Sequence, residues 1–318
     1  MKQSELNILV DKIKSAQTIA IAGHKNPDGD SLCSVLALAR LIHLNFGKDP
    51  ICIYDGNIPD MLDLMPGRRD MQYCGRVAPD TRFDLVFILD CGNVEHLGGM
   101  DAFVKSAGYV ISVDHHVDGA KIGNLCLDDV DASSVGQILF EIAGQLQWSR
   151  DDIVNDLIAV SVLTDTGYFK FARIGAPLRI MADLVDAGVD IEHLSDLMNN
   201  KPRKTILTEA SVVSRAEFFC HGRVALAVVD AHDYKNLDGR GELILSLLGQ
   251  IKGVEYVVLL KQQKENQTGV SLRSRSQPVN EIAVQLGGGG HAYAAGAVVH
   301  DSLENVRAKI LKIFKGAK

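Results

Sequence analysis

Acidic and imidazole side chains gather at four places in the first half of the chain: His24, Asp28 and Asp30; Asp90; Asp114, His115 and His116; and Asp165. Several aspartates brought together would repel one another and would be costly to desolvate as anions. Divalent cations remove that cost, and mixed carboxylate and imidazole ligands suit Mn²⁺ best, with Mg²⁺ and Zn²⁺ as alternatives. Two such ions about 4 Å apart can activate a water and hold a phosphoryl group. The residues therefore indicate metal-dependent chemistry on a phosphate ester.

Three of the four groups directly follow apolar, β-rich runs, which are residues 18–22, 84–89 and 109–113. In open α/β sheets, ligands bind beyond the carboxyl ends of the strands. The fourth residue, Asp165, follows an apolar helix predicted at residues 153–163. We therefore expect one crevice to collect all four groups.

Each group also has a purely structural interpretation. Asp28 and Asp30 could belong to an ordinary turn before the helix predicted at residues 31–44, for which Ser31 is the predicted N-cap. Asp-Gly-Asp could open a calcium loop, but an EF-hand needs Asp or Asn at the next alternate position, where Leu32 stands. The structural interpretations would have to hold independently at all four places, so we prefer the metal centre.

Hydrophobic periodicity predicts an α/β fold with a mostly parallel sheet. The strands are nearly all apolar, as strands buried on both faces should be. Besides the elements above, the first half contains one more predicted strand, at residues 51–54, and two more helices, at residues 135–146 and 189–198. The second half repeats strands and helices on a smaller scale; the strands are residues 224–229, 254–261, 269–273 and 295–299, and the helices are residues 241–250 and 278–286.

A polar, proline-containing stretch at residues 199–204 marks a boundary between two domains. We expect a catalytic domain at residues 1–195, a linker at residues 196–206 and a smaller α/β domain at residues 207–318. The length of 318 residues fits two domains.

The expected second domain contains residues suited to phosphate binding. Successive glycines at Gly288, Gly289 and Gly290 would let backbone N–H groups approach a phosphate or base closely, with His291 as a further donor; a flexible turn is the alternative. Arg273 lies on a predicted strand and could bind a phosphate through two N–H groups; a solvated strand edge is the alternative.

Composition limits the classes of partner. The formal net charge of −7 argues against binding along long nucleic acids, which needs many cation–phosphate contacts. The six cysteines form no Cys-x-x-Cys pair, so we expect thiols in a reducing cytoplasm. No apolar run approaches the ~18 residues of a membrane span, so no membrane partner is expected. A homodimer is compatible with the sequence.

Together, the motifs resemble those of the DHH phosphoesterases. The family is named for an Asp-His-His triplet like residues 114–116, and residues 24–30, Asp90 and Asp165 resemble its other acidic motifs. Residues 287–296 are similar to the glycine-rich signature of the accessory DHHA1 domain. The spacing resembles that of the short bacterial members, of the nanoRNase/pAp-phosphatase (NrnA-like) type.

The resemblance implies a role for each site residue. His24, Asp28 and Asp90 would hold one divalent metal, preferably Mn²⁺. The second metal would have four ligands: Asp30, Asp90, His115 and Asp165. Asp90 would bridge the two metals and His116 would assist charge stabilisation or proton transfer, so these two are the catalytic residues; Asp114 would orient a histidine. The substrate-binding residues would be Arg273, Gly288, Gly289, Gly290 and His291, on a second domain that faces the first.

The function implied is hydrolysis of short oligonucleotides (nanoRNA and linear dinucleotides), of pAp, or of both. One alternative is a pyrophosphate or polyphosphate hydrolase, against which the glycine-rich signature argues. Another is a non-catalytic, metal-dependent nucleotide-binding protein, against which the complete ligand set argues.

Overall fold

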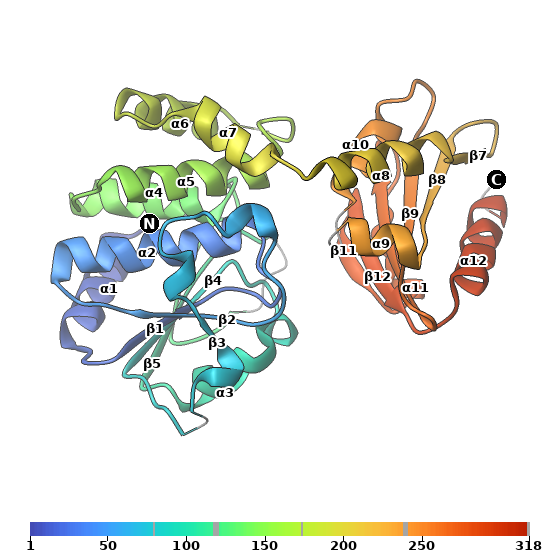
Figure 1. Cartoon of the computed structure of the whole chain (residues 1–318). Coiled ribbons are helices and arrows are strands. Elements are labelled where there is room, and N and C mark those ends of the chain that lie inside the picture. The colour runs from blue at the N-terminus through green and yellow to red at the C-terminus, as the bar shows by residue number, and fades with distance from the viewer. Residues whose placement is uncertain (79, 117–120, 173, 238–240, 317–318) are drawn as a thin grey trace. The chain divides into compact units, whose positions relative to one another are not determined.

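The computed structural model describes residues 1–78, 80–116, 121–172, 174–237 and 241–316. The chain forms two compact units, Met1–Asn200 and Lys201–Lys318 (Figure 1). The division falls between helix α7 (Ile191–Asn199) and helix α8 (Arg203–Ser214), inside the stretch predicted as a linker. No helix in the described ranges has the length and hydropathy needed to cross a membrane.

The first unit is built on a six-stranded, all-parallel sheet with the strand order β3-β2-β1-β4-β5-β6. The strands are β1 (Ile19–Ala22), β2 (Ile51–Tyr54), β3 (Gln72–Tyr73), β4 (Leu85–Leu89), β5 (Tyr109–Asp114) and β6 (Leu125–Asp128). This confirms the predicted parallel α/β fold. The strand order reverses between β1 and β4, and a crevice forms at such a point beyond the carboxyl ends of the strands.

Alternate residues of the buried strands pack into different layers. Ile19 and Ile21 of β1 join a core with the helices on one face, whereas Ala20 and Ala22 join a smaller core on the other. Figure 1 shows α1, α2, α4 and α5 on the first face and α3 on the opposite face. The helices of the unit are α1 (Gln3–Ser15), α2 (Gly29–Phe46), α3 (Asp101–Ser106), α4 (Val135–Leu146), α5 (Asp152–Asp165), α6 (Ala176–Asp186) and α7. Short 3-10 helices lie in the connections, at Asp60–Leu62, Arg68–Asp70, Cys74–Arg76 and Val94–Met100.

Helix α2 begins earlier than predicted, and the predicted N-cap is wrong. The cap is Asp28, whose side chain accepts a hydrogen bond from the Ser31 backbone N–H at 3.1 Å. The Ser31 hydroxyl lies inside the first turn and accepts from the His24 N–H at 3.2 Å. Asp and Ser cap helices equally well, so the tertiary contact of Ser31 with the preceding loop decides between them.

The second unit contains a mixed six-stranded sheet with the order β11-β12-β10-β9-β8-β7, in which only β8 and β9 pair in parallel. The strands are β7 (Glu217–Phe219), β8 (Val224–Val229), β9 (Tyr256–Lys264), β10 (Gln267–Ser274), β11 (Gly289–His291) and β12 (Ala294–Val299). The helices are α8, α9 (Ala231–Asn236), α10 (Glu242–Gly249), α11 (Asn280–Gln285) and α12 (Leu303–Gly316). Separate apolar cores on the two faces involve α8 and α10 on one side and α11 and α12 on the other.

Candidate metal centre

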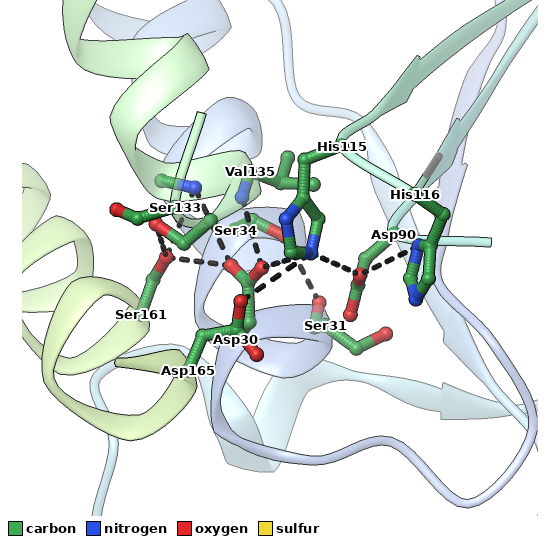
Figure 2. A network of polar contacts seen from close by, with 12 residues as sticks. Asp30, Ser31, Ser34, Asp90, His115, His116, Ser133, Val135, Ser161 and Asp165 are labelled. Atoms are coloured by element: carbon green, nitrogen blue, oxygen red, sulfur yellow. Dashed lines mark hydrogen bonds and ion pairs between the residues drawn. The ribbon is translucent and has the colours of Figure 1, made fainter. Parts of the chain in front are cut away.

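The fold brings all six predicted metal ligands together. They come from the loop after β1, the first turn of α2, the ends of β4 and β5, and the last residue of α5; the six are His24, Asp28, Asp30, Asp90, His115 and Asp165. Figure 2 shows Asp30, Asp90, His115 and Asp165 pointing toward one another. Most of the cluster therefore lies where it was expected, beyond the carboxyl ends of the parallel strands.

Three overlapping groups of the described side chains have the geometry to hold a metal ion: one is Asp90, His115 and His116, and the other two correspond to the predicted ligand sets. In the first predicted set, His24 Nε2 lies 3.8 Å from an Asp28 carboxylate oxygen and 3.5 Å from Asp90 Oδ2. In the second set, His115 Nε2 lies 3.8 Å from Asp30 Oδ2 and 3.4 Å from Asp165 Oδ2. In each group the potential ligand atoms all lie within 4.8 Å of one another.

Asp90 lies between these two sets. Its Oδ2 faces His24, whereas its Oδ1 lies 3.5 Å from His115 Nε2. The backbone of Asp90 has φ of 55°, a left-handed conformation that is uncommon outside glycine, and its N–H donates to Val113 O at 3.0 Å. The side chain is buried. One carboxylate thus presents one oxygen to each set.

The Asp30 carboxylate is held by contacts with α4 and α5 that the sequence analysis did not predict. The Val135 and Gly136 N–H groups, at the start of α4, donate to it at 2.8 and 3.3 Å, and the Ser161 hydroxyl of α5 donates at 2.6 Å (Figure 2). The amino end of a helix carries partial positive charge and favours the charged carboxylate, but burial and the charges of Asp90 and Asp165 outweigh it and raise the pKa of Asp30 well above its usual range. The sequence analysis did not identify Ser161 or Gly136 as partners of Asp30. The one indication in the sequence was a serine in the otherwise apolar helix predicted at residues 153–163.

Asp114 holds His116 in place. Its Oδ1 accepts from His116 Nδ1 at 2.7 Å and from the His115 backbone N–H at 2.9 Å. The hydrogen bond to Asp114 is the main cause that raises the pKa of His116. Burial raises the pKa of Asp114, but its contacts with His116 outweigh burial and lower it. Each member of the pair therefore favours the charged form of the other.

The metal-ligand cluster binds protons strongly when it lacks cations. Burial disfavours the charged form of both histidines, yet neighbouring carboxylates outweigh it: contact with Asp28 and the charge of Asp90 raise the pKa of His24 to about 9. Contact with Asp90 and the charge of Asp165 raise the pKa of His115 to about 10. Burial raises the pKa of Asp165 to about 6. Metal binding must displace such protons, so the donor set fits divalent cations.

The predicted substrate-binding residues lie in the second unit. Arg273, on β10, makes an ion pair with Glu242, with an Nη2–carboxylate oxygen distance of 3.0 Å. The side chain of His291 lies outside the described part of the structure, although its backbone belongs to β11.

The glycines in and just before β11 differ in what surrounds them. A Cβ at Gly288 would collide with the backbone of β12, and Gly290 has φ of 129° and lies close to Ala295. Both therefore need to be glycine for packing. A Cβ at Gly289 would meet nothing within 4 Å, so packing does not explain this glycine.

Comparison with known proteins gives consistent matches along the chain. Residues 18–164 match the DHH family, N-terminal domain, and residues 224–317 match the DHHA1 domain. A probable bifunctional oligoribonuclease and PAP phosphatase NrnA of Streptococcus mutans is 29% identical, over 93% of this chain and 94% of the relative. The bifunctional oligoribonuclease and PAP phosphatase NrnA of Thermus thermophilus is 28% identical, over 93% of this chain and 88% of the relative.

A solved structure has the same fold. The crystal structure of an exopolyphosphatase-related protein from Bacteroides fragilis superposes with a TM-score of 0.90 at 23% identity, covering 99% of this chain and 96% of that one. DHH phosphoesterases depend on metal ions, in agreement with the clustered carboxylates and imidazoles. The chain belongs to the DHH family of phosphoesterases and carries a DHHA1 domain in its second half.

Proposed function

We propose that this protein hydrolyses short oligonucleotides, such as nanoRNA and linear dinucleotides, and pAp, and that it uses two divalent metals. The observation that carries the proposal is the position of Asp90, whose two oxygens face two separate groups of potential ligands. The names of the relatives, oligoribonuclease and PAP phosphatase, support the choice of substrates.

The ligands divide as the geometry suggests. His24, Asp28 and Asp90 would hold one ion, and the second would be held by Asp30, Asp90, His115 and Asp165. Bound divalent ions would supply Lewis acidity and an activated water. We favour Mn²⁺, with Mg²⁺ as the alternative, because both groups mix imidazole with carboxylate.

His116 serves the phosphate in this proposal. Asp114 accepts from its Nδ1, which fixes the orientation of the ring, and raises its pKa. A ring whose charged form is favoured can stabilise negative charge on the phosphate and donate a proton to the leaving oxygen. His116 also belongs to a group of potential ligands with Asp90 and His115. It approaches Asp90 through Nδ1, which already donates to Asp114, so we assign no metal to His116.

The rest of the nucleotide would contact residues of the DHHA1 domain, Arg273, Gly288, Gly289, Gly290 and His291. The Arg273–Glu242 pair is largely exposed, and exposed ion pairs contribute little stability. A substrate phosphate can therefore replace Glu242 at the guanidinium. The domain limits that we propose are residues 1–195 and 207–318, with residues 196–206 as the linker.

We further propose a cytoplasmic protein that acts on small substrates and neither coats long nucleic acid nor binds membranes. The net charge of −7 and the six free cysteines support this setting. A homodimer fits the proposal equally well as a monomer.

The test is one assay with chelator-treated protein. pAp, a linear dinucleotide and pyrophosphate are each incubated without metal, with Mn²⁺ and with Mg²⁺. We expect turnover of pAp or the dinucleotide only with added metal, and Mn²⁺ at least as effective as Mg²⁺. Turnover of pyrophosphate alone would identify a pyrophosphate hydrolase, and nucleotide binding without turnover would identify a binding protein. Full activity after chelation would exclude the metal mechanism.

A further inference from the structure

The segment that directly follows Asp165 has an unusual backbone. Gly167, Tyr168 and Phe169 have φ of 55°, 57° and 65°, so three successive residues lie in the left-handed region. Residues other than glycine adopt this conformation at an energetic cost, and runs of it are rare. Such strain persists only where surrounding contacts enforce it, and it is concentrated at functional sites.

Thr166 supplies several of the enforcing contacts. It is buried, its hydroxyl accepts from the Phe169 N–H at 3.0 Å, and its carbonyl accepts from the Phe171 N–H at 2.9 Å. The Tyr168 N–H donates to Leu163 O, in the last turn of α5, at 2.7 Å. The chain is thereby folded back on the end of the helix, and the direction of the side chains after Gly167 is fixed.

The Phe171 ring is supported on one side and exposed on the other. A Cβ added to Gly167 would lie 2.7 Å from the ring, so the ring packs on the bare Cα of that glycine. Nevertheless, 63% of Phe171 is exposed to solvent, so much of its surface is available to a ligand. Lys170 Nζ lies over the ring, 5.3 Å from its centroid, so a cation that a ligand can displace stands at the ring. A supported, exposed ring next to a cation is the arrangement that stacks a nucleobase and attracts its phosphate.

The ring is also close to the metal centre along the chain. Gly167, on which it packs, is two residues from the proposed ligand Asp165, and two residues span at most about 7 Å. We propose that Phe171 stacks on a nucleobase of the substrate and that Lys170 provides a cation for a substrate phosphate. The inference rests on the proposed hydrolysis of short nucleotides and adds recognition of a base by the catalytic domain itself.

The test compares a linear dinucleotide that carries two adenines with two analogues, each of which lacks one of the bases. Phe171→Leu keeps an apolar side chain but removes the ring, and Phe171→Trp keeps an aromatic one. We expect Phe171→Leu to raise KM and to lower kcat/KM roughly 5- to 100-fold for the complete dinucleotide. The loss should be under twofold for the analogue that lacks the stacked base, and Phe171→Trp should retain activity.

Phe218→Leu is the matched control. Phe218 is 47% exposed and lies on β7, at the edge of the second sheet opposite to β11, so its loss should leave all three substrates unaffected. Equal losses in Phe171→Leu on all three substrates, or no loss on any, would overturn the inference while wild-type turnover still supports the proposed function. If the wild-type protein hydrolyses none of the three, the proposed function fails and the inference fails with it.

Discussion

The metal centre and the Arg273–Glu242 region both bring charged side chains together, but they do so in different ways. Asp30 and Asp90 are 1% and 4% exposed; backbone N–H groups of α4 donate to the Asp30 carboxylate, and the Asp90 N–H donates to Val113 O. The Arg273 and Glu242 side chains are 36% and 75% exposed and contact each other in solvent. Buried groups held by several partners are preorganised, whereas an exposed pair exchanges partners at little cost.

The difference teaches which region should govern chemistry and which should govern affinity. A preorganised cluster adds most where charge develops in the transition state. An exchangeable ion pair adds binding energy only for a substrate long enough to reach it. Substitutions in the two regions should therefore give distinct kinetic signatures.

The largest effect is expected for Asp90→Asn. Asparagine tolerates the left-handed backbone of this position, so the variant should fold. Its neutral side chain would weaken both metal groups, and we expect kcat to fall at least 100-fold, which corresponds to about 2.7 kcal/mol of barrier. Steady-state kinetics and metal analysis are the measurements. If Asp90→Asn keeps a tenth or more of the wild-type kcat, the proposed bridging role of Asp90 is wrong.

The adjacent histidines provide the next test. His115→Ala should lose bound metal, because His115 faces Asp30, Asp90 and Asp165. His116→Ala should keep its metal and lower kcat roughly 10²- to 10⁴-fold, the usual contribution of a general acid. Elemental analysis of the two purified variants separates the roles. Equal metal loss in both would contradict the assignment.

Arg273→Ala should affect affinity in proportion to substrate size. Loss of a charged phosphate contact costs about 1.5–3 kcal/mol, or roughly 10- to 100-fold in kcat/KM for pAp and dinucleotides. Bis-p-nitrophenyl phosphate, which lacks the distant phosphate, should be nearly unaffected, and His291→Ala should behave in the same way. Arg307→Ala, which removes another exposed ion pair, with Glu217, is the matched control. If kcat/KM falls equally for nucleotides and for bis-p-nitrophenyl phosphate, the second domain has only a structural role.

Substitutions of the adjacent glycines Gly288 and Gly289 make the test of the second domain more specific. Because a Cβ at Gly289 meets open space, Gly289→Ala should keep its melting temperature, whereas Gly288→Ala should lower it through collision with β12. If Gly289→Ala also lowers kcat/KM for nucleotides, the glycine is needed for the approach of a ligand. Unchanged kinetics would remove Gly289 from the substrate site.

The smallest effect concerns pH and the metal-free protein. The pKa values of His24 and His115 are raised to about 9 and 10 in the folded chain, above the ordinary 6.5. The stability that these charges contribute is full below pH 6.5 and is lost as the pH rises through 9 and 10. The metal-free protein should therefore melt at lower temperature at pH 10 than at pH 6.5, and Mn²⁺ should reduce the difference. Thermal melts at several pH values, with and without metal, would measure it; a metal-free protein more stable at pH 10 would contradict the assignment.

Much of the fold was predictable because the buried strands are nearly continuous apolar runs. The bounds of β2, β8 and α4 agree with the predicted residues 51–54, 224–229 and 135–146. The strand β6 was missed because its burial is incomplete and its apolar run is short. Helix α8 begins at Arg203, within the polar stretch predicted as the linker. Pro202 does not prevent this, because it is the N-cap residue, where a helix needs no backbone N–H donor.

The clustering of the candidate metal ligands was predictable from residue type and position at strand ends. Their supporting contacts were not, because they depend on tertiary structure: Val135 N–H reaches Asp30 across 105 positions of sequence. Likewise, the partner of Arg273 is on a helix 31 positions away. Periodicity gives the elements, but only their packing determines which side chains meet.

The contact between Asp30 and the first turn of α4 also creates a spectroscopic reporter. The Val135 and Gly136 amides donate to the same carboxylate whose Oδ2 faces His115. Any cation drawn to that carboxylate changes the electron density that those two protons experience. Their amide resonances should shift as metal is added, so occupancy of one half of the centre can be followed through backbone signals without a substrate.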